Sequence, residues 1–235
     1  MQKIAFYITY LPLRIFGKIL PARQALVLML SLHKRLLTLI ADRASEYNGG
    51  VSPKHRLMRY HDFFISRVRE GEKILDIGSG IGFLAYDLVK VGAEVTGIEL
   101  SKKNFDKANR LYQDRNLHFI NGDALKDLPN QEFDTVVMSN VLEHIEHRPE
   151  FIRTAQAKAK ATRWLIRVPC FDRDWIVPLA KELGLDSRLD ETHFTEFTKE
   201  SFYQEMAEAN LEVKYLEVRW GEIWAELTPK NQWKF

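Results

Sequence analysis

The chain has 235 residues, of which 46% are hydrophobic and 28% charged, so its composition excludes a disordered protein and provides enough chain for a large α/β domain with attachments. The single cysteine, Cys170, excludes an internal disulfide framework and a zinc site built from cysteines, and it fits a cytoplasmic setting. The net charge of +2 conceals an asymmetry: residues 1–69 hold twelve Lys or Arg against three Asp or Glu (+9), which leaves 22 against 29 (−7) for the remainder.

Residues 1–69 are predicted to form a basic helical extension that precedes a domain of residues 70–235. Residues 1–22 are expected to be irregular, because two prolines and a glycine interrupt them. Residues 23–44 have the apolar spacing of a helix, and Asn48-Gly49-Gly50 ends it. Ser52-Pro53 is typical of a helix start, and Gly71 ends the helix that follows.

The basic extension favours an anionic partner, which is a phospholipid surface, a phosphorylated substrate or RNA, and a solvated helical face is the alternative. It could also cap a ligand pocket of the domain that follows or form the surface of a homodimer. No segment is expected to cross a membrane, because the apolar stretches without a charge or histidine, residues 4–13 and 24–32, are far shorter than the ~20 residues required. The expected location is the cytoplasm, with peripheral contact to a membrane surface as a further option.

Beyond Gly71, short apolar runs alternate with helical stretches. The runs KILDI, EVTGIE, LHFIN, FDTVVMS and RWLIRVP are predicted strands, and residues 83–90, 102–112 and 149–161 are predicted helices. Thr198 is expected to cap a later helix with Phe202, Met206 and Leu211 on its apolar face. LEVKYLEV and EIWAEL are separated by three residues and should pair as an antiparallel hairpin. The predicted fold is therefore α/β: a Rossmann-like, mostly parallel seven-stranded sheet with an antiparallel C-terminal hairpin and helices on both faces.

The stretch ILDIGSGIG, residues 74–82, ends a predicted strand with Asp76 and then places glycine at positions 78, 80 and 82. Glycines after a strand allow a ligand to approach the backbone closely. A dinucleotide-binding loop would have the pattern G-x-G-x-x-G or G-x-G-x-x-A, but Phe83 occupies the last position here, and Asp76 would repel a pyrophosphate. The loop favours a ligand with a cationic group.

Two further acids follow the next two predicted strands. Glu99 ends the second strand, 21 residues after Gly78, where a carboxylate can accept both hydroxyls of a ribose. Asp123 follows the third strand and can reach a purine amine. Three acids at successive strand ends, without a phosphate-binding lysine, indicate a cofactor that has an adenosine and a positive charge but no phosphates.

This pattern resembles the class I S-adenosylmethionine-dependent methyltransferases over residues 70–228. ILDIGSGIG is similar to the family's first motif, GIELS to its second-strand acid, NGDALKDLP to its adenine-side acid, and FDTVVMSNVLEHIEH to the segment around its fourth strand. The resemblance implies S-adenosylmethionine as the cofactor and S-adenosylhomocysteine (SAH) as the product. A plain Rossmann-like domain with structural glycines would leave Glu99 and Asp123 unexplained.

The resemblance also assigns roles within the predicted cofactor site. Asp76 would lie near the amino acid end of the cofactor, Glu99 would hold the ribose and Asp123 the adenine amine. The other predicted contacts are loop glycines that admit the methionine portion, residues flanking the adenine, and residues facing the reactive side: Gly78, Ser79, Gly80, Gly82, Leu100, Ala124, Ser139 and Asn140.

Two histidines are candidates for acceptor chemistry. VLEHIEH resembles the ubiquinone-pathway O-methyltransferases and their small-molecule relatives, and it contains His144. Some of that group have E-x-x-E-H at this place and bind a divalent ion, but Asn140 stands where the first glutamate would be, so no metal is expected. His193, in DETHFTEFT before the Thr198 cap, is favoured as a base or acceptor contact, and a loop histidine bonded to backbone is the alternative. Trp175 lies in an insertion that commonly shapes the acceptor pocket in this fold.

The expected activity is O-methylation of a small molecule, glycan or lipid-linked acceptor by in-line methyl transfer. The alternatives are an RNA or protein methyltransferase, or a cofactor-binding membrane-surface module without catalysis. Nucleic acid is not the expected partner, because the fourth strand is followed by SNVL instead of the N-P-P-Y-type tetrapeptide that marks many amino-group methylators.

Overall fold

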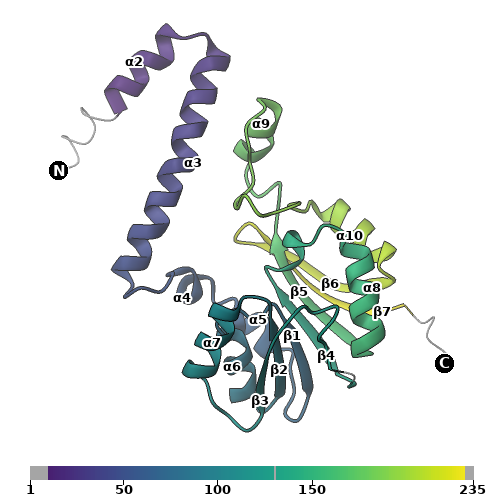
Figure 1. Ribbon diagram of the computed structural model, residues 1–235. Helices are drawn as coiled ribbons and strands as arrows, with labels where there is room; N and C mark the ends of the chain where they lie inside the picture. Colours follow the sequence, from purple (N-terminus) through teal and green to yellow (C-terminus); the bar gives the residue numbers. More distant parts are fainter. Residues whose placement is uncertain (1–9, 130, 231–235) are drawn as a thin grey trace. The chain divides into compact units, whose positions relative to one another are not determined.

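A seven-stranded sheet organises the larger part of the chain (Figure 1). In the computed structural model, which describes residues 10–129 and 131–230, the strand order is β3-β2-β1-β4-β5-β7-β6. Strands β1 to β5 are parallel, and β7 is antiparallel to both β5 and β6. The strands are β1 (Lys73–Ile77), β2 (Glu94–Glu99), β3 (Leu117–Asn121), β4 (Thr135–Ser139), β5 (Arg163–Pro169), β6 (Leu211–Arg219) and β7 (Glu222–Pro229). The predicted fold class is confirmed.

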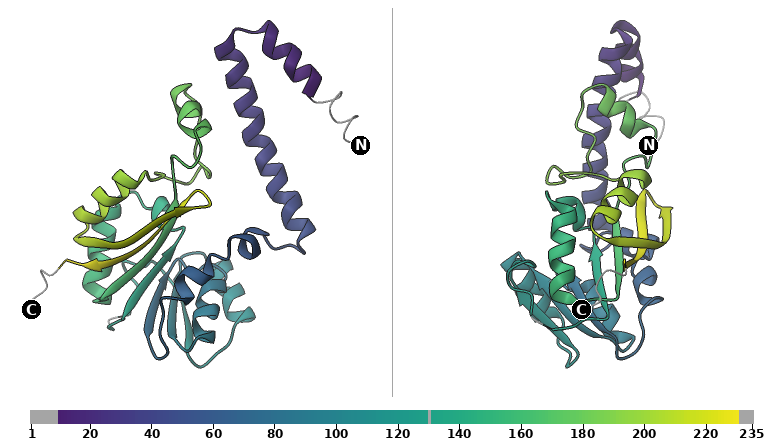
Figure 2. Two further views of the ribbon diagram at one scale, coloured as in Figure 1. Left: turned by 180° about the vertical axis from the view of Figure 1, so that it is seen from behind. Right: turned by 90° about the vertical axis from the view of Figure 1, so that its right-hand side faces the viewer.

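Two apolar cores lie on the two faces of this sheet, because successive residues of a buried parallel strand point to opposite faces. On β1, Leu75 belongs to one core and Ile74 to the other. Helices α5 (His61–Ile65), α6 (Phe83–Lys90) and α7 (Lys102–Leu111) cover one face, and α8 (Arg148–Ala159) and α10 (Lys199–Glu208) cover the other (Figures 1 and 2). The sheet is therefore enclosed, and its strand ends are the place left for a ligand.

Local signals account for several element boundaries. Thr198 caps α10 in a capping box with Ser201, as the sequence predicts. The turn between β6 and β7 consists of Trp220 and Gly221, whose φ angles of 55° and 73° are those of a tight hairpin turn. Leu211 was expected on the apolar face of α10 but begins β6, because α10 ends at Glu208.

Two expectations for the first 70 residues are wrong. Residues 11–19 are helical (α2, Leu11–Ile19) and not irregular, because Pro12 lies in the first helical turn, where its missing N–H costs nothing. The helix expected after Pro53 is two short helices, α4 (Lys54–Met58) and α5. Arg59, with a left-handed φ of 46°, separates them.

The described residues divide into two compact units, one formed by those up to residue 57 with 174–187 and the other by those of 58–173 with those from 188 onward. The predicted boundary at residue 70 differs from this division. Phe63 and Phe64 of α5 are buried against Trp224 of β7 and thus belong to the sheet-containing unit. The first unit contains α2, α3 (Ala22–Tyr47) and α9 (Ile176–Glu182) within its described residues.

Helix α3 is long and apolar. It has 26 residues, and an 18-residue window of it reaches a mean hydropathy of 1.3, with 6% of that window buried. By length and composition alone the helix could cross a membrane, whereas the lengths of the charge-free stretches predict no spanning segment. Lys34 and Arg35 lie near its middle.

Candidate functional site

The carboxyl ends of the parallel strands bring the predicted site residues to one edge of the sheet. Asp76 on β1 lies in register with Gly97 on β2, two residues before Glu99. Ser139 ends β4, and Asp123 follows β3 by two residues. Parallel strands present their carboxyl ends on the same side of the sheet. The predicted cofactor-binding residues at or after the ends of β1 to β4 therefore lie at one edge.

The loop glycines differ in what their missing side chains allow. A Cβ on Gly78 would lie 2.5 Å from Val141 Cγ2, and one on Gly82 would lie 2.7 Å from Phe119 Cζ, so both positions are closed by packing. A Cβ on Gly80 would meet no atom within 4 Å. Gly80 has a left-handed φ of 57° and faces open space, so it is the glycine of this loop that leaves the backbone accessible to a ligand.

Glu99 connects the loop of residues 78–82 to the end of β2 by a hydrogen bond. Its Oε2 accepts a hydrogen bond from Gly80 N at 2.8 Å, and its Oε1 accepts one from Ser101 N at 2.8 Å. A carboxylate has about four acceptor positions, so two remain for the hydroxyls of a ribose. Asn121 Nδ2 supports the same edge by donating to the backbone oxygen of Glu99 at 2.9 Å. Leu100 is 75% exposed and presents an uncovered apolar surface beside this acid.

Asp123 lies in the turn after β3. Its Oδ1 accepts a hydrogen bond from Leu125 N at 2.8 Å, and its Oδ2 lies 3.5 Å from Lys126 Nζ. Ala124 packs against the core that contains Ile98. The carboxylate of Asp123 retains acceptor positions that an adenine amine can use.

Asp76 is a buried acid beneath the loop. It is 2% exposed, and among the described residues its Oδ2 has no hydrogen-bond partner. Burial, and then the charge of Glu99, raise the pKa of Asp76 to about 8. Ser79 Oγ is also buried without a partner in the described chain. A cationic group such as the ammonium of an amino acid would satisfy this carboxylate.

Asn140, after β4, is directed toward β5 and β7. It has a left-handed φ of 55°, its Oδ1 accepts from Arg167 Nε at 3.0 Å, and its Nδ2 lies 3.4 Å from Glu222 Oε1. Arg167 is 7% exposed and stacks 3.9 Å above the ring centroid of Tyr60. Asn140 therefore positions a buried arginine at the strand ends, a role that its predicted contact with the cofactor did not include.

Three side chains gather next to this point. One ligand atom from each of Glu143, His144 and His193 lies within 4.8 Å of the others. Glu143 and His144 belong to a short 3-10 helix (Leu142–His144), whereas His193 lies about fifty residues later in the loop before α10. Glu143 is completely buried, and neither carboxylate oxygen bonds to another described residue. Burial raises the pKa of Glu143 to about 8.

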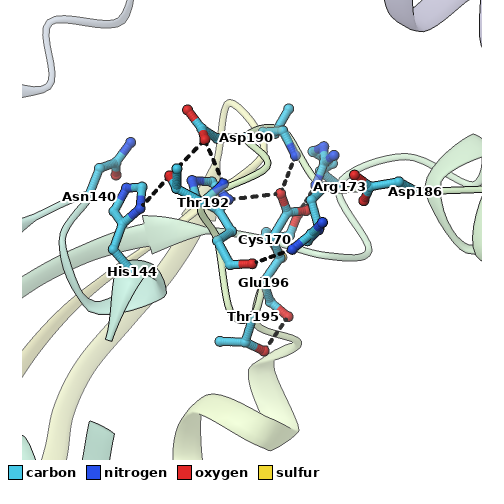
Figure 3. Close-up of polar contacts among 12 residues, drawn as sticks. Asn140, His144, Cys170, Arg173, Asp186, Asp190, Thr192, Thr195 and Glu196 are labelled. Carbon is cyan, nitrogen blue, oxygen red and sulfur yellow. Dashed lines mark hydrogen bonds and ion pairs between the residues drawn. The ribbon is translucent and has the colours of Figure 1, made fainter. Parts of the chain in front are cut away.

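Further side chains orient the two imidazoles (Figure 3). His144 Nδ1 lies 2.9 Å from Thr192 Oγ1, which donates to Asp190 Oδ1 at 2.7 Å. His193 Nδ1 lies 3.2 Å from Glu196 Oε1. The Nδ1 atoms of both rings are thus engaged, and the two ring centroids are 4.7 Å apart in an edge-to-face arrangement. Sequence reasoning missed these orienting residues, although the spacing of three between His193 and Glu196 was a readable signal.

The donor set fits a divalent cation. One carboxylate and two imidazoles are common ligands of a divalent metal, and ligating histidines usually donate their other nitrogen to a carboxylate or similar group. Burial and the neighbouring His193 lower the pKa of His144, which favours the neutral ring that binds metals. This set differs from the E-x-x-E-H pattern, because Asn140 replaces its first glutamate and His193 comes from a separate loop.

The surroundings of Glu196 show how firmly the loop is held. Its side chain is 1% exposed and also pairs with Arg173, whose Nη1 donates to the backbone oxygen of Cys170 at 3.0 Å. Arg188 Nη1 donates to the backbone oxygen of His193 at 2.8 Å. The loop before α10 is thus tied to the end of β5, which places His193 beside Glu143.

Comparisons with known proteins agree with this geometry. A sequence profile described as a methyltransferase domain matches residues 49–216. Ubiquinone biosynthesis O-methyltransferases are similar: that of Chromobacterium violaceum is 30% identical over 53% of this chain and 54% of its own length, and the mitochondrial one of Schizosaccharomyces pombe is 30% identical over 52% and 48%. The chain spans about half the length of the curated relatives it matches.

Solved structures share the fold. Magnesium protoporphyrin IX methyltransferase from Synechocystis PCC 6803 with bound SAH has a TM-score of 0.59 at 16% identity, over 75% of this chain and 83% of that one. The small RNA methyltransferase HEN1 has a TM-score of 0.61 at 17% identity, over 73% of this chain and 25% of that one.

Proposed function

Because the chain belongs to the class I S-adenosylmethionine-dependent methyltransferases, we propose that it methylates a hydroxyl oxygen of a small-molecule, glycan or lipid-linked acceptor. S-adenosylmethionine supplies an electrophilic methyl group on a sulfonium. The acceptor oxygen forms the new C–O bond as the S–CH₃ bond breaks, its proton leaves to a base, and SAH is released.

The observation that carries the proposal is the cluster of Glu143, His144 and His193 at the strand ends. A neutral hydroxyl is a weak nucleophile, and a group that removes or weakens its proton accelerates the transfer. Neutral His144 or His193 can accept that proton through Nε2. If Glu143 and both histidines instead hold a divalent cation, the ion would act as a Lewis acid on the acceptor oxygen.

The cofactor site supports the same reading. Gly80 leaves the loop backbone open, Glu99 has acceptor positions for a ribose, and Asp76 suits the ammonium of the methionine portion. Asp123 would bind the adenine amine. These residues would bind and orient the cofactor at the carboxyl ends of the strands, the same edge of the sheet at which Glu143, His144 and His193 gather.

The similarity to ubiquinone biosynthesis O-methyltransferases favours oxygen as the methylated atom. The segment SNVL after β4 agrees with it, since the tetrapeptide typical of amino-group methylators is absent there. RNA or protein as the acceptor would be the first alternative to test.

The experiment uses S-adenosylmethionine labelled on its methyl group. The full chain is incubated with a cell extract, and lipid, glycan, small-molecule, RNA and protein fractions are separated. The control is Glu99→Gln, which keeps the side chain's shape but weakens its two hydrogen bonds and its hold on a ribose. The expected result is label in a small-molecule, glycan or lipid fraction that resists the mild alkali that cleaves methyl esters.

Two outcomes would contradict the proposal. Label confined to RNA or protein would change the acceptor class. No label above the Glu99→Gln control, with intact SAH binding and with extracts from several growth conditions, would assign the chain to cofactor binding without transfer.

A further inference from the structure

Helices α2 and α3 expose many large apolar side chains. On α2, Ile15, Phe16 and Ile19 are 49%, 55% and 72% exposed. On α3, six residues are between 40% and 59% exposed, and most recur every three or four positions: Leu28, Leu32, Leu36, Leu37, Leu39 and Ile40. Ala25 is the one residue of α3 that is buried within the described chain. A surface of this size requires a partner or a membrane.

The same helices carry only positive charge over most of their length. Residues 1–41 contain six Lys or Arg and no Asp or Glu. On α3, the spacing of 3.6 residues per turn puts Lys34 and Thr38 on the side opposite Leu32, Leu36 and Ile40, and Arg35 at the border of that apolar face. A broad apolar face bordered by lysine and arginine is typical of helices that lie in the interface of a membrane.

The α9 insertion belongs to the same unit and adds an aromatic residue. Lys34 Nζ lies 3.3 Å from Asp186 Oδ2, and Arg23 Nη2 lies 3.3 Å from the backbone oxygen of Leu183, so both contacts join α3 to the end of the insertion. Trp175, directly before α9, is 74% exposed. Tryptophan is enriched where a protein meets the headgroup region of a bilayer.

We infer that α2, α3 and the α9 insertion dock this protein peripherally on an anionic lipid bilayer. A second copy of the chain is a poorer occupant, because two such surfaces would bring like charges together. A membrane-spanning α3 is also a poorer account, because Lys34 and Arg35 would lie near the bilayer centre at a cost of roughly 2.5–3.5 kcal/mol each. The inference does not depend on the proposed acceptor.

Sedimentation with vesicles tests the inference. The full chain is mixed with vesicles of phosphatidylcholine alone, or of three parts phosphatidylcholine and one part phosphatidylglycerol, without a methyl acceptor. The expected result is at least about tenfold stronger partitioning to the anionic vesicles, weakening at high salt. Alkaline carbonate should release the protein.

Matched variants separate the two contributions. Leu37→Asp should weaken partitioning about tenfold or more, whereas Leu111→Asp on α7, equally exposed at 48% against 49%, should not. Lys18→Glu with Arg35→Glu should abolish the preference for anionic vesicles, and Lys103→Glu with Lys107→Glu on α7 should leave it. All variants should keep their SAH affinity, which shows that the sheet-containing unit is folded.

Each contrary outcome has its own reading. Equal partitioning to both vesicle types, or none, would overturn the inference. Resistance to carbonate would replace docking with a spanning helix. A dimer in lipid-free solution that Leu37→Asp dissociates, without vesicle binding, would assign the surface to a second copy. Vesicle binding is measured without methyl transfer, so it can fail or succeed separately from the proposed activity.

Discussion

Glu99 Oε2 accepts a hydrogen bond from the backbone N–H of Gly80 at 2.8 Å, so the acid at the end of β2 holds the open glycine of the loop after β1. The acid thus keeps the loop in the conformation that leaves Gly80 uncovered, and under the proposed function it would also bind a ribose. Loss of its carboxylate should therefore impair two parts of the cofactor site together.

Glu99→Ala should lower SAH affinity about 100-fold or more, because hydrogen bonds to a charged group contribute ~1.5–3 kcal/mol each. Glu99→Gln should lose less, because one oxygen remains. Glu94→Gln at the opposite end of β2 is the control, since Glu94 is exposed and distant from the strand ends. Isothermal titration calorimetry measures the three affinities. Unchanged binding by Glu99→Ala would refute the assignment of this acid.

Gly80→Ala should weaken SAH binding while the protein stays folded. An added Cβ meets no protein atom within 4 Å, so only the left-handed backbone opposes the change, at ~1–2 kcal/mol. Gly71→Ala is the matched control, because Gly71 has a φ of 76° and the same open surroundings but lies away from the loop. The temperature of thermal unfolding should fall equally in both variants, and SAH affinity should fall only in Gly80→Ala. Equal affinities would mean that no ligand approaches Gly80.

Asp76 should make SAH binding depend on pH. Burial and Glu99 raise its pKa to about 8 in the free protein, so the acid is mostly neutral at pH 7. The ammonium of SAH favours the ionised form and lowers this pKa, so binding should release close to one proton below pH 8. Affinity should rise between pH 6 and pH 8 and then level off. Calorimetry in two buffers of different ionisation enthalpy counts the protons.

Asp76→Asn is the companion variant for that measurement. It should bind SAH more weakly and release no proton from this site. Because the raised pKa means that the folded state holds a proton the unfolded chain has lost, wild-type stability should fall as pH rises from about 4 toward 8; Asp76→Asn should lose the part of this slope that Asp76 contributes and keep the part due to Glu143. Proton release unchanged in Asp76→Asn would assign it to another group.

Divalent metal ions should bind the cluster of Glu143, His144 and His193. Mn²⁺ or Zn²⁺ should raise the unfolding temperature of the wild type, and chelation should reverse the rise. Glu143→Gln should abolish the effect, because it removes the one carboxylate of the set. Glu146→Gln, an exposed acid in the same segment, should respond as the wild type does. If these ions leave the unfolding temperature of the wild type unchanged, the histidines would be favoured as proton acceptors without a metal.

The gathering of the predicted cofactor-binding residues at one edge of the sheet could be foreseen from the sequence, because it depends on short-range order. Asp76 and Glu99 each occur at or just before a strand end, and parallel register puts such ends side by side whatever the rest of the chain does. The cluster of Glu143, His144 and His193 could not be foreseen from the sequence. His193 comes close to Glu143 only through the packing of a loop that Arg173 and Glu196 hold in place. The left-handed backbone of Asn140 was equally invisible, since asparagine adopts it only where tertiary contacts favour it.

The pairing of His193 with Glu196 leads to the last prediction. Glu196 is buried, and its Oε1 lies 3.2 Å from His193 Nδ1, a contact that fixes the ring beside Glu143 and His144. Glu196→Gln preserves the shape but removes the charge that orients and polarises the imidazole, so metal affinity should fall about 10- to 100-fold. Glu191→Gln, exposed in the same loop, is the control. SAH affinity should stay unchanged in both variants, because the loop of residues 78–82 is a separate part of the structure.

Two results would contradict this account. A parallel loss of SAH binding in Glu196→Gln would mean that the residue supports the fold of the entire edge of the sheet at the carboxyl ends of the strands. An unchanged metal affinity would mean that His193 needs no orienting acid.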